Sequence, residues 1–243
     1  MTRPIEIRIN CKICGEAGNY YTLASAYIID QTLDGRIIDI SGGIESLYLM
    51  QCSKCKFTAP DISKVKDKDV PKIKKIINSK EYQTALTNPL FSEYYVNKNV
   101  CWAIICEKLK NFVDAGWAYL HCAWKCEYYK IEDKRKVIKV KFREKTEPTI
   151  SLTKQFRKKA IECFKKVKEK DKNFARSDDE ELIIMIDTLR QMEEFEEAQK
   201  LLNQAKKAVK DLKIKKLFNY ENKLIKQKDF APHTYSEIFK RKR

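Results

Sequence analysis

The sequence predicts a mainly α protein built of helical hairpins, with a small β module at its N-terminus. Two observations support this fold class. Two C-x-x-C pairs lie within the first 55 residues, and beyond Pro60 glycine nearly disappears while Lys, Glu, Ile, Leu and Ala recur at helical spacing. At 243 residues and 43 % hydrophobic composition, the chain is long enough to bury a core.

The two cysteine pairs have the spacing of a metal site. Cys11 and Cys14 lie in RINCKICGEAGNYY, and Cys52 and Cys55 lie in LMQCSKCKFTAP. Each tight turn directs two thiolates at one point, and two such turns complete a tetrahedron around zinc. We therefore expect one structural Zn²⁺ with no open position for a substrate. A rubredoxin-like iron site or a redox-responsive site is the alternative.

The segment between the cysteine pairs predicts short strands. Residues 20–29 are rich in aromatic and β-branched side chains, Asp34-Gly35 is a hairpin-type turn, residues 36–40 alternate, and 47–50 lead into the second pair. We expect residues 1–60 to form a zinc ribbon with an elaborated β-hairpin. Residues 61–243 are expected to form an α-helical array.

Within that array, two segments predict helical hairpins of similar length. They are NVCWAIICEKLKNFVDAGWAYLHCAWKCEYY and SDDEELIIMIDTLRQMEEFEEAQKLLNQAKKAV, the second of which opens with a capping pattern at Ser177. Shorter helices are predicted near Pro71 and Ser79, before Asn88-Pro89 interrupts.

The two hairpins are related by an internal repeat. Ala115-x-x-x-Tyr119-x-x-Cys122 matches Ala198-x-x-x-Leu202-x-x-Ala205, and a third, degenerate or interrupted copy is Ala160-x-x-x-Phe164-x-x-Val167. This resembles the tetratricopeptide pattern, in which alanine and large residues pack two helices together. We therefore expect a tetratricopeptide-like array, with a generic helical bundle as the alternative.

Several motifs together resemble a known group of proteins. These are Cys11-x-x-Cys14-Gly, the second pair followed by an aromatic residue, Ala-Pro-Asp-Ile-Ser at 59–63, and AGWAYLHCAW at 115–124. The chain is similar to uncharacterised bacterial and archaeal proteins that join a zinc ribbon to tetratricopeptide-like helices. The resemblance implies a metal site and an interaction surface, and it assigns no catalytic residue.

The other cysteines raise the question of a second metal site. Cys101, Cys106, Cys122 and Cys126 lie on one predicted hairpin beside His121. Ordinary burial explains them better, because free cysteine is among the most buried residue types. The chain has only two histidines and no glycine-rich phosphate loop. We therefore expect no enzymatic activity.

The favoured function is a non-catalytic interaction module that binds a protein or peptide partner. Stacked helical hairpins leave a curved groove lined by first-helix residues. On the tetratricopeptide template, the expected partner-binding residues are Asn97, Ile104, Glu107, Lys108, Ile183, Asp187 and Arg190.

Charge supports an alternative function, sequence-independent binding of RNA or DNA. The net charge is +16, with 17 Lys and Arg against 7 acids over residues 128–175, and 14 against 4 over residues 200–243. Lysine outnumbers arginine 40 to 10, as an AT-rich genome would also produce, and lysine lacks the planar fork used to read bases. The sequence leaves the choice open.

The expected location is the cytoplasm. Met1 to Pro4 opens no apolar signal-like run, and no apolar stretch is long enough to cross a bilayer. Nine cysteines in a reducing compartment favour metal binding or burial over disulfides. The sequence does not predict the oligomeric state.

Overall fold

The computed structural model describes residues 3–39, 47–127, 129–134, 137–142 and 147–239. It is about 56 % helical, which confirms a mainly α fold. The helices are α1 Val70–Ile77, α2 Lys80–Thr87, α3 Pro89–Glu93, α4 Asn97–Lys108, α5 Phe112–Cys126, α6 Glu147–Lys168, α7 Asp178–Gln191, α8 Phe195–Ala208, α9 Leu212–Lys226 and α10 Tyr235–Ile238, and a 3₁₀ turn, Asp67–Asp69, precedes α1. None of the helices in the described part of the chain is long and apolar enough to span a membrane.

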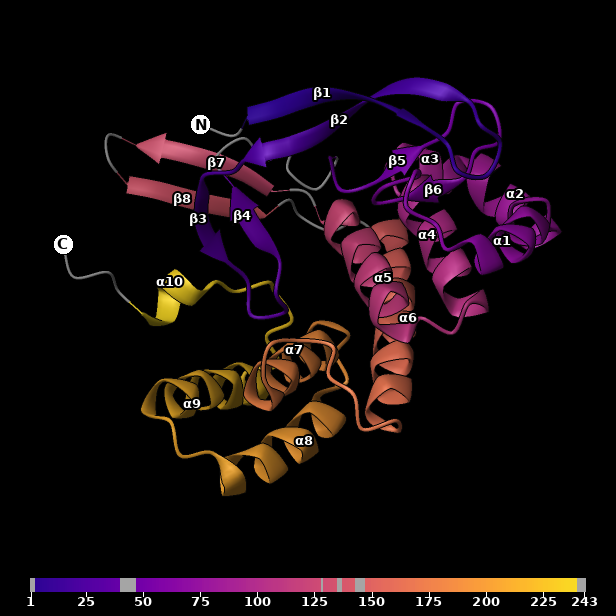
Figure 1. Ribbon diagram of the computed structural model, residues 1–243. Helices are drawn as coiled ribbons and strands as arrows, with labels where there is room; N and C mark the ends of the chain where they lie inside the picture. Colours follow the sequence, from indigo (N-terminus) through magenta and orange to yellow (C-terminus); the bar gives the residue numbers. More distant parts are fainter. Residues whose placement is uncertain (1–2, 40–46, 128, 135–136, 143–146, 240–243) are drawn as a thin grey trace.

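The strands of the described residues form antiparallel two-stranded sheets: β1 Arg3–Asn10 with β2 Ala17–Ser25, β3 Ile28–Gln31 with β4 Ile37–Asp39, β5 Met50–Gln51 with β6 Thr58–Ala59, and β7 Tyr129–Lys134 with β8 Val137–Phe142. The long β1–β2 hairpin lies over one end of the molecule, above β5–β6 and the helices α1 to α4 (Figure 1). Helices α7 to α10 form a second group at the other end, and α5 and α6 lie between the two groups.

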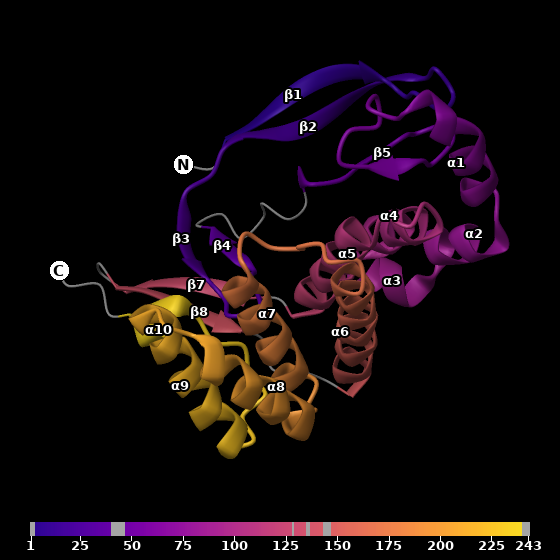
Figure 2. The same ribbon diagram turned by 60° about the horizontal axis from the view of Figure 1, so that its bottom comes forward.

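The β3–β4 hairpin leaves the ribbon and packs against the C-terminal helices. Thr32 forms an isolated bridge with Thr234, and the amide of Leu33 donates to the carbonyl of His233. Figures 1 and 2 both show β3–β4 beside the C-terminal group rather than beside β5–β6. The predicted turn at Asp34-Gly35 is present, with Gly35 at φ +94°. This contact joins residues on either side of the expected boundary at residue 60.

Both predicted helical hairpins form, and they share one turn geometry. In the α4–α5 turn, the amide of Asn111 donates to the carbonyl of Cys106 and Lys110 has φ +59°; in the α7–α8 turn, Glu194 donates to Leu189 and Glu193 has φ +68°. These are Schellman-type helix ends in which a charged residue takes the left-handed position that glycine usually fills. The aligned repeat residues are buried in both hairpins: Ala115, Tyr119 and Cys122 in one, and Ala198, Leu202 and Ala205 in the other.

The third repeat copy is a single helix. Ala160, Phe164 and Val167 are buried on α6, which packs along α5. The tetratricopeptide template requires a first helix before α6, but the β7–β8 hairpin occupies that place in the chain. The pattern Val-Ile-Lys-Val-Lys-Phe in β8 alternates at the period of a strand, not of a helix.

Apolar side chains gather in two cores. The larger one joins the cysteine pairs of the ribbon to α1, α2, α4, α5 and α6. The smaller one lies among α7, α8, α9 and α10, and Leu33 from the β3–β4 turn and Ile161 from α6 also belong to it. The two cores are linked by buried charged side chains, which sequence analysis did not predict.

Arg157 on α6 is the centre of the link. It is 1 % exposed and donates to both carboxylate oxygens of Glu127 at 2.8 and 2.7 Å, to Asp34 at 3.0 Å and to the side-chain oxygen of Gln191 at 2.8 Å. Burial alone would lower the pKa of Arg157, but Glu127 and Asp34 raise that pKa above its ordinary value. The β3–β4 turn, α5, α6 and α7 therefore meet at one guanidinium.

Arg190 on α7 forms a second buried group. Its guanidinium pairs with Asp187, lies 3.2 Å from Glu221 and donates to the backbone carbonyl of Asp229 at 2.6 Å. Burial, followed by the charge of Asp187, raises the pKa of Glu221 well above its ordinary value. The guanidinium of Arg190 acts on the pKa of Glu221 in the opposite direction.

Replacing Arg157 is expected to cost about 3–5 kcal/mol of unfolding free energy, because Arg157→Leu removes the guanidinium that the buried carboxylates of Asp34 and Glu127 share. Urea unfolding checks this. The matched control is Lys154→Leu on the same helix, whose ion pair with Glu193 at 2.8 Å is at the surface and is worth about 0–1 kcal/mol. A loss under about 1 kcal/mol for Arg157→Leu would contradict the assigned role.

His233 predicts a pH dependence of stability. Its ring nitrogens lie 3.0 Å from Asp229 and 2.7 Å from Glu237, and Tyr220 and Arg190 are also close. Burial lowers the pKa of His233, but Glu237 and Asp229 outweigh burial and raise that pKa above about 6.5. Its stabilising contribution is therefore complete below pH 6.5 and is lost as the pH rises through the folded-state value.

The measurement is the unfolding free energy from pH 6 to pH 9 for the wild-type chain and for His233→Gln. The wild-type chain should lose more stability across this range than the variant. Parallel curves for the two proteins would show that the ion pairs of His233 contribute nothing.

Candidate metal centre

The structure brings Cys11, Cys14, Cys52 and Cys55 together as predicted. Their four Sγ atoms all lie within 4.8 Å of one another, with Cys11 and Cys55 3.7 Å apart and Cys14 and Cys52 3.5 Å apart. For metal–sulfur bonds of about 2.3 Å, the sulfurs of a regular tetrahedron are about 3.8 Å apart. The residues therefore fit a metal ion held by four thiolates.

The two cysteine turns are local copies of one another. In the first, the amide of Gly15 donates to the carbonyl of Cys11, and the amide of Cys11 donates to the carbonyl of Glu16, both at 2.8 Å. In the second, Lys56 donates to Cys52 at 3.0 Å and Cys52 donates to Phe57 at 2.9 Å. Gly15 has φ +78° and Lys56 has φ +61°, so the second turn places a lysine in the left-handed conformation that costs about 1–2 kcal/mol.

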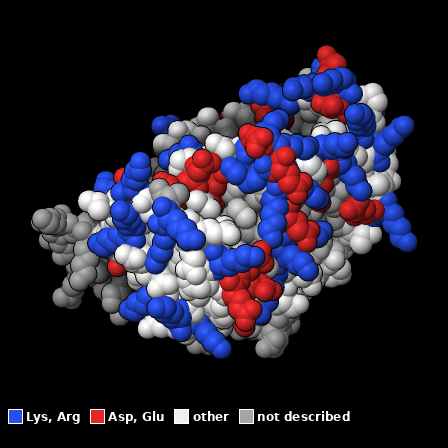
Figure 3. Space-filling view, turned by 90° about the horizontal axis from the view of Figure 1, so that it is seen from below, with Lys and Arg blue, Asp and Glu red and all other residues white. Residues whose placement is uncertain are grey.

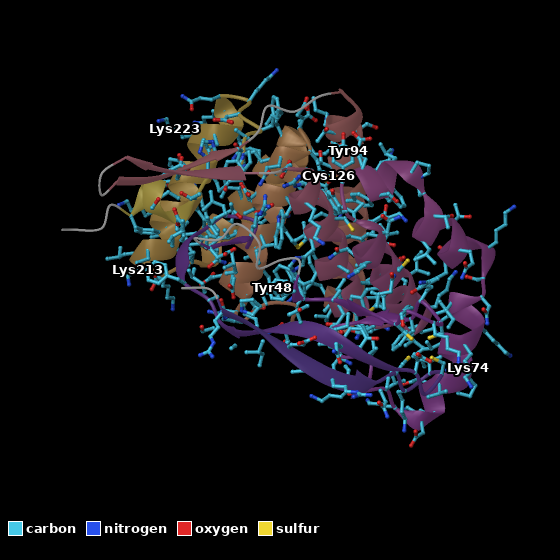
Figure 4. The ribbon with its side chains drawn as sticks, turned by 90° about the horizontal axis from the view of Figure 1, so that it is seen from above. Tyr48, Lys74, Tyr94, Cys126, Lys213 and Lys223 are labelled. Atoms are coloured by element: carbon cyan, nitrogen blue, oxygen red, sulfur yellow. The ribbon has the colours of Figure 1, made fainter. Side chains whose placement is uncertain are left out.

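Helix α2 holds the second cysteine turn, residues 52–57, in place. The hydroxyl of Tyr82 on α2, which is fully buried, donates to the carbonyl of Lys56 at 2.7 Å and to Thr58 at 3.2 Å. The loop after β6 holds the first turn, because the amide of Lys12 donates to the carbonyl of Ile62 at 2.9 Å. Figure 4 shows sulfur atoms gathered at the end of the molecule that carries Lys74 of α1.

Burial governs the protonation of these thiols in the absence of a cation. It raises the pKa of Cys11 and that of Cys55. Burial also tends to raise the pKa of Cys14. Hydrogen bonds from the amide of Glu16 and from the neighbouring thiols outweigh burial, so the pKa of Cys14 is lowered. A bound cation would replace the protons and stabilise all four thiolates.

The remaining cysteines do not form a comparable group. Within the described ranges, the four ribbon cysteines are the one set of His, Cys, Asp and Glu side chains whose ligand atoms lie close enough together to hold a metal ion. Cys101, Cys106, Cys122, Cys126 and Cys163 are buried among apolar side chains. Burial, followed by Cys126, raises the pKa of Cys122, which makes it a poor nucleophile.

His121 faces aromatic rings instead of the cysteines. It makes edge-to-face contacts with Tyr48 and Trp124 and lines a cavity of about 110 Å³ with Trp117. Burial, then Lys125 and Arg36, lowers the pKa of His121 to about 3, so the ring is neutral near pH 7.

Four of the seven expected partner-binding residues lie inside the protein. Ile104 and Ile183 are 4 % and 1 % exposed, and Asp187 and Arg190 are fully buried. The face of α7 that would line a groove is covered by α9 and by the segment around Asp229. A partner segment therefore does not reach these side chains in this fold.

The other three expected residues make local contacts. Asn97 donates to the carbonyls of Ala85 and Leu86 at the end of α2, Glu107 accepts from the hydroxyl of Tyr119, and Lys108 pairs with Glu81 at the surface. Lys108 is exposed at the end of α4, the helix that also carries buried Ile104, whereas Ile183, Asp187 and Arg190 lie on α7. The structure does not bring the seven residues together on one surface.

A groove in the ribbon was not predicted. It has a volume of about 460 Å³ and separates β2 from β5; its lining is Gly18, Asn19, Tyr20, Tyr21, Leu47, Leu49, Met50, Gln51, Ser53 and Lys98. The adjacent tyrosines and the alternation of Leu47 with Leu49 are visible in the sequence. The tyrosines of β2 and the leucines that precede β5 lie across the groove from one another because the two cysteine turns beside these strands come together.

Comparison of the chain with protein-family models, with curated proteins and with solved structures finds no match.

Replacing Cys52 with serine is expected to reduce bound metal from one ion per chain to near zero, because three thiolates hold a metal far less tightly than four. Elemental analysis of the purified protein measures this. Cys163→Ala is the matched control, since Cys163 is equally buried but lies on α6 outside the cluster. Full metal content in Cys52→Ser would show that the four-cysteine assignment is wrong.

Proposed function

We propose that this protein is a non-catalytic interaction module built on one structural zinc ion. The observation that carries the proposal is the closed set of four thiols, seated on the helical core. Four thiolates complete the tetrahedral shell of zinc, so no position remains for a substrate or an activated water. The ion serves to fold the ribbon and to hold it against α1, α2 and α4.

The proposal includes the finer description of the fold. The helical hairpins are tetratricopeptide-like, which is supported by their common turn and by the burial of their aligned residues. The combination of ribbon and helical hairpins supports the resemblance to the uncharacterised prokaryotic proteins. A reducing, cytoplasmic location is supported by nine free cysteines.

The partner surface that we propose is the ribbon groove. Strand β2 pairs with β1 along one edge, and β5 pairs with β6 along one edge. Within the described chain the second edge of β2 and the second edge of β5 are unpaired, and these edges border the groove. Such edges accept an extended segment by strand addition. Tyr21, which is 58 % exposed, and the cation of Lys98 lie along the groove. The partner is therefore an extended protein segment with an acidic residue near Lys98.

The test is a selection of random 16-residue peptides on the zinc-loaded protein, followed by anisotropy with the selected peptides. Tyr21→Ser with Lys98→Glu should weaken binding at least about tenfold, because the pair removes a large contact and reverses the charge. The matched control is Leu212→Ser with Lys213→Glu on α9, where Leu212 is 80 % exposed. Peptides that bind the groove variant and the control equally would refute the groove as the partner site.

A further inference from the structure

The α8–α9 basic face is a group of lysines on two neighbouring helices. It comprises Lys200, Lys206 and Lys207 on α8 and Lys215, Lys216, Lys223 and Lys226 on α9. Within the described part of the chain, none of them forms an ion pair. On α6, by contrast, Lys154, Lys165 and Lys168 each pair with a carboxylate.

Acidic residues are nearly absent from this part of the chain. Glu196 and Glu197 lie in the first turn of α8, where Glu197 pairs with Lys165 of α6, and from Ala198 to Lys226 the sequence has two more, Asp211 and Glu221. Asp211 caps α9 by accepting from the amides of Lys213 and Ile214, and Glu221 is fully buried. Figure 3, which looks at the molecule from below, shows Lys and Arg gathered at the end where α9 lies, whereas both signs alternate over α6.

The two helices hold these lysines on one rigid support. The side chain of Gln199 on α8 donates to that of Asn222 on α9 at 3.2 Å, and buried Leu202, Leu217 and Phe218 join the helices beneath. Burial, and then the charge of Lys226, lowers the pKa of Lys206, which shows that cations from both helices lie close together. Such a concentration of one sign lowers stability unless an anion offsets it.

The chemistry of the face selects the phosphate backbone of a duplex. At about 1.5 Å per residue, the lysines from Lys200 to Lys207 extend over about 10 Å of α8 and those from Lys215 to Lys226 over about 16 Å of α9, which matches a repeating anion better than a single phosphate. Single strands need free aromatic rings for stacking. The rings nearest the face, Phe195 and Phe239, are half-buried, and the Nζ of Lys216 lies 5.1 Å from the centre of the Phe239 ring. Lysine contacts phosphate as a point charge and does not read base edges as arginine does.

We propose that the α8–α9 basic face binds the phosphate backbone of double-stranded nucleic acid without reading its sequence. This site is at the opposite end of the molecule from the metal centre (Figures 1 and 2). It is independent of the ribbon groove, so either proposal can fail without the other.

The experiment measures anisotropy of a labelled 24-base-pair DNA duplex against the zinc-loaded chain from 50 to 200 mM salt. The plot of log K against log salt should have a slope of about −4 to −6, from about 0.9 per lysine–phosphate contact. Replacing Lys207, Lys223 and Lys226 with glutamine should reduce the magnitude of that slope by about 3 and weaken binding at least about tenfold at 100 mM salt. A duplex of scrambled sequence should bind equally.

The matched control replaces Lys72, Lys74 and Lys75 of α1 with glutamine, which removes the same net charge from three exposed lysines elsewhere. It should leave affinity within about threefold. Equal losses in the two triple variants would overturn the proposal in favour of total charge. Tighter binding to single-stranded DNA, or to phosphatidylserine vesicles at the same salt, would overturn the choice of a duplex, and no binding at 50 mM salt would overturn the site itself.

Discussion

The pairing of Arg157 with Asp34 and Glu127 is the interaction on which the arrangement of the two cores depends. A guanidinium that is 1 % exposed is costly to bury, so its partners must stay within hydrogen-bonding distance. Those partners come from the β3–β4 turn and from α5, and Gln191 comes from α7. A shift of any of these elements breaks a buried ion pair or hydrogen bond of Arg157, and this fixes the second core relative to the first.

The N-terminal residues are therefore attached at two distant points. The cysteine turns attach β1–β2 and β5–β6 to α1, α2 and α4, and the β3–β4 turn is attached to the charged centre more than half the chain away in sequence. The long strand β2 lies between these attachments. Within the described residues β2 pairs with β1 alone, and residues 18–21 of β2 line the ribbon groove. In the function that we propose, the metal ion positions this edge and takes no part in a reaction.

The sequence predicted those features that depend on local spacing. The C-x-x-C pairs, the helical hairpins and the cap at Ser177 are each set within a few turns of the chain, and the structure confirms their positions. The burial of Arg157 and Arg190 was not predictable in this way, because charged residues on amphipathic helices are ordinarily exposed. The charged partners of Arg157 lie 30 and 123 residues away, and Arg190 meets Glu221 and Asp229 of later segments besides its neighbour Asp187. The repeat template places Asp187 and Arg190 in a groove, whereas the structure buries both. In a tetratricopeptide array, each helical hairpin packs against another hairpin of the same kind. Here α9 and the segment around Asp229 cover α7 instead.

The central claim is that the metal centre is closed and structural. Zinc K-edge X-ray absorption on the purified, reduced protein tests it most directly, because it counts the ligands and measures their distances without altering a residue. The account predicts four sulfur scatterers at about 2.3 Å and no oxygen or nitrogen in the first shell. A fit that requires three sulfurs and a light atom would show an open position, and the protein would then have to be considered as a metalloenzyme.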